Sequence, residues 1–345
     1  MMEQALKPTI AGAERRPASA WEIKRPFGTR TVVAVVLAFI LCLMTGHRVE
    51  MDRMLALSGQ GALAAVGLRE SSQVSAGLAQ IANSLFPVQI SERTEVGRLD
   101  NFDPNHLPWM AHVEEQETRT RRLNPGTLQM EETVEHREVL VEPLGYLWHV
   151  SSKMLETLEI ALWATLLAVL FSLPLAWFSA RNYTANRLSY GLARGLVSML
   201  RAVPELVTAL FLVLAYGFGP IAGVLALALH SAGFLGKFYA EDVETADDKR
   251  QEALRAIGAG KLKVMRFAVL PQLMPQFIGY TLYVLDRNVR MATVVGLVGA
   301  GGIGQELKGR YDMYNYSHVG TILIAIFLTV FLLDQIAARM RRRFA

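Results

Sequence analysis

The sequence predicts an all-α membrane protein with six transmembrane helices. Of its 345 residues, 52% are hydrophobic and only 19% are charged, whereas soluble proteins carry about 25% charged residues. The apolar residues also gather in long blocks that contain no Asp, Glu, Lys or Arg. A soluble protein with unusually apolar buried helices is the alternative, and the number of blocks, each bounded by clustered charge, argues against it.

The blocks set the number of expected spans, since a bilayer-crossing helix needs roughly 20 mostly apolar residues. They are Thr31–Gly46, Ile160–Phe178, Leu206–Gly236, Ala268–Leu285 and Val319–Leu333. The third block is too long for one span, and the turn sequence Gly217–Pro220 divides it into two. The first block follows basic residues, as a cleaved secretory signal would, but no small-x-small cleavage site follows it. We therefore predict six spans and an uncleaved first helix.

The distribution of basic residues predicts the orientation of these spans. Short loops rich in Lys and Arg stay in the cytoplasm. Basic residues gather in segments 1–30, 181–194, 237–266 and 339–343, and all four fall on one side if six spans alternate. Both termini are therefore expected in the cytoplasm of a multi-pass protein of a bacterial inner membrane. Because topology explains these basic groups, they do not indicate binding to nucleic acid.

Residues 47–150 are then expected outside the cytoplasm. This segment has nine Arg, fifteen Asp or Glu and no Lys. Apolar residues recur at helical spacing in Leu55–Leu85, whereas Val134–Val141 is typical of a strand. A small accessory domain and a partly ordered loop both fit this pattern. The single cysteine, Cys42, lies in the first predicted span and excludes a disulfide within the chain.

The loop between the fourth and fifth spans has the most informative pattern. We expect one helix over Asp242–Ile257, ending at Gly258, and a second over Lys261–Val269. The residues of the pattern are Glu252, Ala253, Leu254, Gly258, Leu270 and Pro271. A small alanine permits close approach of a partner, a glutamate can pair with a basic group, and a glycine allows a sharp change of direction.

This pattern resembles the EAA signature of ABC-importer permeases, in which Glu-Ala-Ala is followed at fixed spacing by Gly and by Ile-x-Leu-Pro. Leu254 replaces the second alanine and Ala268 replaces the isoleucine, while the spacing is kept. The resemblance implies the type I, MetI-like, bundle, with a coupling helix that docks on a separate ATPase. An ordinary charged surface helix is the structural alternative.

The resemblance gives each part of the chain an expected role. Residues 1–30 form a cytoplasmic segment, 31–46 the first transmembrane helix, and 47–150 an extracytoplasmic segment. Residues 151–345 form the permease domain, with the coupling loop at 237–271. The implied partners are two ABC ATPases, an extracytoplasmic substrate-binding protein, membrane lipid and a second permease copy, in a homodimer or a heterodimer. We expect no cofactor in this chain, since the ATPases bind ATP and Mg²⁺.

A narrower resemblance, to phosphonate permeases, covers roughly Met154–Arg343. The segments that carry it are Arg201–Leu206, Gly219–His230, Leu270–Phe277 and Asn288–Glu306. It implies a translocation path for phosphonate, with another small oxyanion such as phosphate or phosphite, or an amino acid, as alternatives. The outer segment 47–150 is longer than is usual in that branch.

Several charged residues and glycines are candidates for lining this path, since charges inside a membrane bundle are costly and often mark a pathway. The candidates are Arg201, Glu205, His230, Arg287, Arg290, Gly301, Gly302 and Gly304. Arginine suits bidentate contacts with an oxyanion. Structural roles are equally open: Arg201 pairing with Glu205, Asp286 pairing with Arg290, and His230 bonding a neighbouring helix.

Two glycine-rich motifs are poor matches to nucleotide sites. Gly299–Gly304 fits G-x-G-x-x-G, yet it lacks a surrounding βαβ unit and an acidic residue roughly 20 residues further on. Gly258–Lys261 lacks the spacing of a P-loop. Five of the seven histidines lie in the outer segment at no metal-ligand spacing. A membrane-embedded hydrolase, the alternative of another class, would need a nucleophile or metal set that the sequence does not offer, so we predict no enzymatic activity.

Overall fold

The computed structural model describes residues 28–66, 72–99, 102–104, 107–108, 110–123, 130–184 and 186–344. Most of the predicted cytoplasmic segment 1–30 therefore lies outside the described residues. The chain divides into two compact units, Met1–Gln80 and Ile81–Ala345.

The first unit contains α1 (Thr29–Arg48), α2 (Met51–Ala65) and the beginning of α3 (Gln73–Leu85). Helix α1 confirms the first predicted span as a helix, and its 20 residues measure about 30 Å, the thickness of a bilayer core. Its apolar side chains are exposed throughout, Phe39 and Met44 among them, and Cys42 is an exposed free thiol. An exposed apolar helix of this length suits a lipid surrounding.

The second unit contains a small sheet in the outer segment, where the sequence predicted one strand in an otherwise helical chain. Strands β1 (Glu92–Glu95), β2 (His112–Leu123) and β3 (Met130–Glu142) pair antiparallel in the order β1-β3-β2. The predicted strand Val134–Val141 is confirmed within β3, where Val139 is buried with its two apolar neighbours. Strand β2 was missed because its sequence is almost entirely polar and lacks alternation.

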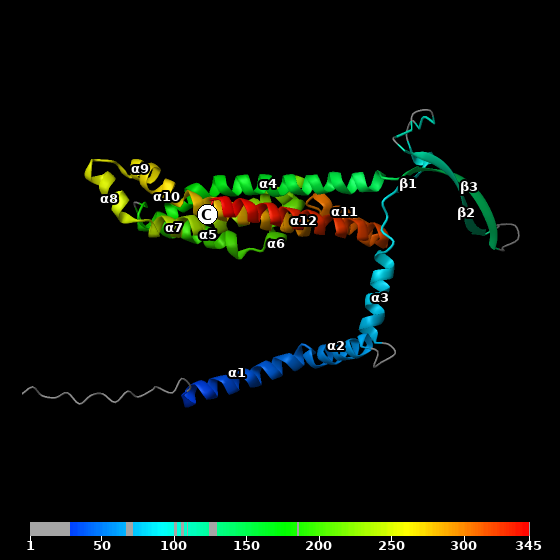
Figure 1. Cartoon of the computed structure of the whole chain (residues 1–345), viewed down its shortest axis with the longest axis horizontal. Helices are drawn as coiled ribbons and strands as arrows, with labels where there is room; N and C mark the ends of the chain where they lie inside the picture. Colours follow the sequence, from blue (N-terminus) through cyan, green and yellow to red (C-terminus); the bar gives the residue numbers. More distant parts are fainter. Residues whose placement is uncertain are drawn as a thin grey trace, which may run out of the picture. The chain divides into compact units, whose positions relative to one another are not determined.

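The rest of the second unit is a helical bundle (Figure 1). Its helices are α4 (Gly145–Ser179), α5 (Arg187–Ala202), α6 (Glu205–Tyr216), α7 (Pro220–Thr245), α10 (Leu270–Gly296), α11 (Gly302–Asp312) and α12 (Tyr316–Phe344). Helix α7 packs along α4, and α10 packs against α4, α7 and α12. The α4–α7 contact is built from alanines and glycines such as Ala164, Ala226 and Gly223, and small residues permit the close helix approach that membrane bundles use.

Four described helices are long and apolar enough to cross a membrane, and the pair α5–α6 makes five if it is one broken span. Helix α6 alone has 12 residues, about 18 Å, and is too short to span unaided. The predicted third span therefore needs α5, and the two helices meet at an angle of 89°. Helix α10 is not among these apolar helices, because glutamines and charged residues interrupt it. The predicted number of six spans therefore stays a prediction.

The two ends of α4 carry different structures (Figure 1). The beginning of α4 contacts the segment before the sheet, where the amide of Leu147 donates to the carbonyl of Ile90 at 3.2 Å. At its other end, the loop after α4 packs against α8 (Asp248–Ala256), where Tyr183 meets Gln251. The 35 residues of α4 measure about 52 Å. The sheet and α8 thus lie on opposite sides of a membrane-sized bundle.

Candidate functional site

The predicted coupling loop forms a helix–turn–helix, with two corrections to its boundaries. The expected helix Asp242–Ile257 is broken, because α7 continues to Thr245 and α8 starts only at Asp248. The Asp247 side chain causes the break by capping α8, accepting a hydrogen bond from the Lys249 amide at 3.0 Å. The second expected helix is not separate: α9 (Lys261–Val264) runs through the π-helical turn η2 (Met265–Val269) directly into α10.

The turn after α8 depends on Gly258, as the sequence predicted. Its φ of +85° lies in the left-handed region that favours glycine. The Gly258 amide donates to the carbonyl of Arg255 at 2.9 Å, and the next amide bonds back to Leu254. The predicted Pro271 stands in the first turn of α10, a position that proline tolerates. The sequence therefore located the turn at Gly258 correctly, whereas Pro271 lies at the start of α10 within a continuous helix.

Helix α8 has an exposed face and an anchored face. Glu252 and Ala253 are exposed, whereas Leu254 is half-buried against the core of the bundle. Gln251, on the anchored face, is 1% exposed. Its Oε1 accepts a hydrogen bond from the Tyr183 hydroxyl at 3.0 Å, and its Nε2 donates to the carbonyl of Ala246 at 3.3 Å. Sequence analysis missed Gln251, although a glutamine beside the motif was the available signal.

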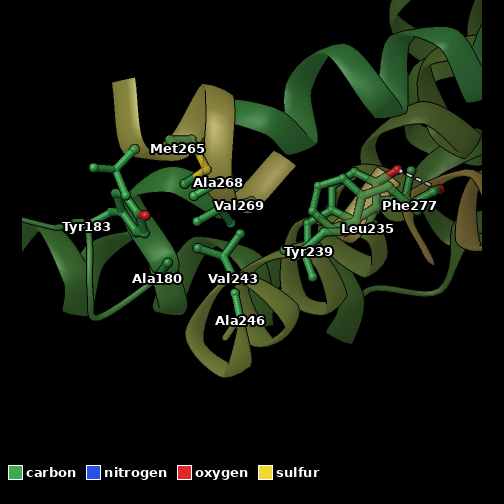
Figure 2. Packing of buried hydrophobic residues seen from close by; sticks show 14 of the residues in the cluster. Ala180, Tyr183, Leu235, Tyr239, Val243, Ala246, Met265, Ala268, Val269 and Phe277 are labelled. Atoms are coloured by element: carbon green, nitrogen blue, oxygen red, sulfur yellow. Dashed lines mark hydrogen bonds between the residues drawn. The ribbon is translucent and has the colours of Figure 1, made fainter. Parts of the chain in front are cut away.

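A hydrophobic cluster joins this helix–turn–helix to the bundle (Figure 2). It brings together the end of α4, the second half of α7, η2 and the start of α10. Its members include Ala180, Tyr183, Tyr239, Val243, Ala246, Met265, Ala268, Val269 and Phe277. The rings of Tyr239 and Phe277 stack with centroids 4.1 Å apart. Leu254 of α8 packs against this cluster, which therefore connects α8 with α7 and α10.

The candidate path residues gather where α5 and α6 meet. Glu205 is the first residue of α6 and is 8% exposed. Its Oε1 lies 2.5 Å from Nη2 of Arg287 on α10, and its Oε2 lies 3.7 Å from Nδ1 of His230 on α7. The same Arg287 nitrogen lies 3.0 Å from His230 Nε2. Three helices thus contribute to one buried charged cluster, which we call the Glu205 cluster.

Donor chemistry fixes the tautomer of His230 in this cluster. A guanidinium has only donors, so the Nε2 that faces Arg287 accepts a hydrogen bond and carries no proton. The proton is then on Nδ1, which lies 3.2 Å from the carbonyl of Val203. That carbonyl belongs to the break between α5 and α6, where the helical hydrogen-bond pattern is interrupted. His230 therefore bonds a neighbouring helix and orients Arg287.

The other charged candidates have separate positions. Asp286 accepts two hydrogen bonds from Arg290, at 3.1 and 2.7 Å, as the spacing i,i+4 predicted. The suggested pairing of Arg201 with Glu205 is not the arrangement found, since Glu205 bonds Arg287. Within the described part of the chain, Arg201 forms no ion pair, and its aliphatic stem lies beside Gly233. Arg201 ends α5, so it stands at the same break as Glu205.

The glycine-rich segment serves helix packing. Gly301 and Gly302 have φ of +83° and +70° and are buried. A Cβ on Gly304 would meet the Thr293 carbonyl and approach Gly296 Cα to 2.9 Å. The chain before this segment forms the end of α10, and the described residues around it form no βαβ unit. Close packing of α10 and α11 explains Gly304, whereas a Cβ on Gly301 would approach Pro220 of α7 and one on Gly302 would meet Thr157 of α4. A role of these glycines in lining the path stays a prediction.

A buried polar chain beside the Glu205 cluster was not found from the sequence. Ser231 donates to Asn288 Oδ1 at 2.9 Å, and Asn288 donates to Thr165 Oγ1 at 3.0 Å. All three side chains are at most 3% exposed. Polar groups at such depth are retained when they bond one another, and these bonds tie α4, α7 and α10 together. Their signals were Thr165 and Ser231 inside two apolar blocks, and Asn288 just after the end of the fifth.

A second charged cluster joins the outer segment to the bundle through α11. Arg310 donates to Glu306 at 2.8 Å, and it lies 3.6 Å from Glu92 at the start of β1. His149 lies 3.3 Å from Glu306. Burial raises the pKa of Glu306, but hydrogen bonding and charge from Arg310 outweigh it, so this pKa is below its usual range. In the described residues, no group of His, Cys, Asp and Glu is arranged to hold a metal ion.

Comparison with known proteins identifies the family. Residues 172–345 match the family described as the binding-protein-dependent transport system inner membrane component. HtxE of Stutzerimonas stutzeri, provisionally named a phosphite transport system permease protein, is 58% identical over 261 residues, covering 75% of this chain and 99% of the relative. This chain belongs to the binding-protein-dependent permease family. It is accordingly an inner-membrane transport subunit of an ABC importer and not an enzyme, and it works with an ATPase and a substrate-binding protein.

Two further comparisons bear on this permease. PhnE2 of Escherichia coli strain K12, provisionally named a cryptic phosphonate transport system permease protein, is 43% identical over 121 residues, 35% of this chain and 99% of the relative. Among solved structures, the inward-facing MetNI methionine ABC transporter has a TM-score of 0.52 at 22% identity, covering 58% of this chain and 97% of that one. This likeness confirms the MetI-like fold.

Proposed function

We propose that this permease forms the translocation path for a small phosphorus oxyanion, with phosphonate and phosphite as the two candidates. The observation that carries the proposal is the 58% identity to HtxE over nearly the whole of that relative. The likeness to PhnE2, named for phosphonate, supports the same chemical class. Phosphate and amino acids are the remaining alternatives, and an amino acid carries less negative charge to engage the cluster.

The charges of the bundle suit such a substrate. Arg287 and Arg290 lie on α10 beside carboxylates, and Arg201 ends α5 with no ion pair among the described residues. Guanidinium groups bind oxyanions through paired N–H donors. Charge inside a membrane bundle is retained where it serves a pathway or a pair. We assign Arg201, Glu205, His230, Arg287 and Arg290 to the path on this argument.

A complete importer needs more chains than this one. One bundle supplies half of a path, so we propose a homodimer of permeases, two ABC ATPases that bind ATP and Mg²⁺, and one substrate-binding protein outside. The sheet and α8 lie at opposite ends of α4, which supports an outer segment 47–150 and a cytoplasmic α8. With both termini in the cytoplasm, the receptor docks on the outer segment and the ATPases on α8.

The coupling surface is the exposed face of α8, with Glu252 and Ala253 toward the ATPase. Gly258 and Pro271 position the two helices, and Leu254 and Leu270 anchor them in the bundle. Closure of the ATPases displaces α8, and the packed cluster carries the displacement into α7 and α10 as a rigid-body movement. Glu252→Ala and Gly258→Pro are therefore expected to insert normally in the membrane and to lose uptake. Normal uptake by both variants would contradict the coupling role.

The substrate is tested by uptake into proteoliposomes that contain the permease with its ATPase and receptor. Labelled methylphosphonate and labelled phosphite are each offered, with and without ATP, and unlabelled phosphate and methionine serve as competitors. ATP-dependent uptake of either phosphorus anion, resistant to methionine, is the expected result. Inhibition of anion uptake by methionine, or uptake of neither anion, would refute the proposed substrate class.

A further inference from the structure

The Glu205 cluster contains a carboxylate in the place where a transported anion would bind. Resting on the proposed function, we propose that Glu205 is a built-in competitor for the oxyanion. It occupies Arg287 between transport events, yields Arg287 to the substrate, and returns to release it. The ligand class is a small phosphorus oxyanion, and the site is the break between α5 and α6.

The position of the carboxylate is that of an anion ligand. Glu205 begins α6, and helix N-termini favour negative charge because of their free N–H groups and dipole. Its Oε1 lies 2.5 Å from Nη2 of Arg287. A guanidinium facing a helix N-terminus is a site that an oxyanion also satisfies, because carboxylate and phosphonate oxygens accept the same donors. The chain's own carboxylate fills this site.

The charge of the cluster requires that the anion and Glu205 exchange places at Arg287. Glu205 and Arg287 together are neutral, and their side chains are only 11% and 24% exposed. An arriving anion would add a second negative charge at one buried guanidinium, and like charges in a poorly solvated place repel strongly. The anion can bind Arg287 only when Glu205 moves away. Arg201, at the other side of the break and in no ion pair among the described residues, supplies the positive charge that draws the anion in.

Arg287 keeps its position during the exchange. His230 accepts from Arg287 at 3.0 Å through Nε2 and is itself held by the carbonyl of Val203 at 3.2 Å. The guanidinium carbon also lies 6.0 Å from the centre of the Phe234 ring, within reach of a cation–π contact. His230 also lies 3.7 Å from Glu205 through Nδ1, but its contacts with Arg287 and Val203 do not pass through the carboxylate. The binding group is thus oriented before the anion arrives, and only the carboxylate has to move.

The competitor explains how an anion leaves a buried arginine. Transport requires binding that is favourable enough for entry and weak enough for exit. Without Glu205, release would leave a buried guanidinium without a counter-charge, which is unfavourable. The returning carboxylate replaces the lost contact, so the substrate is held weakly and passes on.

The test is oxyanion binding and uptake by the intact importer that carries variant permeases. Glu205→Gln keeps the size of the side chain and removes its charge. We expect the variant to bind labelled methylphosphonate or phosphite about 10- to 100-fold more tightly, the range for loss of one competing charged hydrogen bond, while KM and kcat for uptake both fall. Arg287→Gln should lose binding. Glu244→Gln is the matched control, since it makes the same change at a half-buried carboxylate that pairs with Arg194 and not with a path arginine, and it should retain wild-type affinity.

The outcomes separate the two ideas. If the wild-type importer takes up either anion but Glu205→Gln binds it no more tightly, the competitor role is wrong and the proposed function stands. If Glu244→Gln tightens binding equally, charge in general and not exchange is the cause, which also overturns the inference. If the wild type transports neither anion, the proposed function itself fails. Glu205→Asp, which retracts the carboxylate by one methylene, provides a smaller tightening should Glu205→Gln not assemble.

Discussion

The packing role of the glycine-rich segment is tested most sharply by Gly304→Ala. A Cβ at Gly304 would meet the carbonyl of Thr293 and lie 2.9 Å from Gly296 Cα. Both obstacles are backbone, so α11 must move away from α10 to admit a methyl group. Overpacking of this kind typically costs about 1–3 kcal/mol. Gly309, five residues further along the same helix, is the matched control, since a Cβ there meets nothing within 4 Å.

Gly309→Ala should be stabilising by roughly 0.5–1 kcal/mol, because alanine restricts the unfolded chain more than glycine does. The two variants should therefore differ by about 1.5–4 kcal/mol in stability, or about 3–16 °C in melting temperature for a bundle of this size. Thermal denaturation of the purified permease, followed by loss of the folded peak in size-exclusion chromatography, measures the difference. Equal melting temperatures for Gly304→Ala and Gly309→Ala would show that α10 and α11 are not closely packed here.

Three further predictions follow from other sites. Gln251→Leu leaves the buried Tyr183 hydroxyl without its acceptor and should destabilise α8 locally by about 1–3 kcal/mol. The expected result is faster amide hydrogen exchange in α8, which the added substitution Tyr183→Phe should slow again. Unchanged exchange in Gln251→Leu would contradict this prediction. At Gly258 the φ of +85° penalises side chains by about 1–2 kcal/mol, and no neighbour obstructs a Cβ, so uptake should fall less for Gly258→Asn than for Gly258→Val. Arg310 outweighs burial and lowers the pKa of Glu306 in the folded protein. The stability that this pair contributes is therefore complete above the unfolded pKa of about 4.3 and is lost as pH falls through the folded pKa. The melting temperature of Glu306→Gln should accordingly depend less on pH below about 5 than that of the wild type.

The coupling region shows how far local sequence rules reach. Gly258 and Pro271 were placed correctly because each has a conformational preference that acts within one turn of chain. The break at Ala246–Asp247 was missed, although Asp247 is a good N-cap residue. Good helix formers on both sides of it concealed the interruption. Local sequence preferences thus located Gly258 and Pro271. Whether the chain continues one helix or caps a new one at Asp247 could be seen only in the packed structure.

The outer segment was the hardest part to predict. The strand in β3 had a signal because Val139 and its neighbours are apolar and buried. Strand β2 consists mostly of charged and polar residues, and it is a strand because β3 offers it a hydrogen-bonding edge. Its partner is the next strand in the chain, with Leu123 opposite Met130, and pairing through the backbone requires no apolar alternation in the paired sequence. No single-sequence rule detects such an element.

The candidate path residues were identified individually, but their partners were not. Glu205 and Arg287 are 82 positions apart, and nothing local to either residue selects the other. The nearer pairing, Arg201 with Glu205, satisfied helical spacing only if one helix continued through Pro204. The 89° break removes that geometry and turns Glu205 toward α7 and α10. A proline three residues after Arg201 was the warning, because the residue before a proline disfavours helix.

The break also decides which part of the Glu205 cluster moves. On one side of the cluster, Ser231 on α7 bonds Asn288 on α10 at 2.9 Å. Further along the same two helices, the rings of Tyr239 and Phe277 stack. His230 and Arg287 therefore lie on two helices that are joined twice and move together. Glu205 stands on the far side of an interrupted helix, where small changes at the junction swing the end of α6. In the proposed exchange, Arg287 and His230 therefore keep their mutual orientation, and a change at the junction of α5 and α6 carries Glu205 away from both.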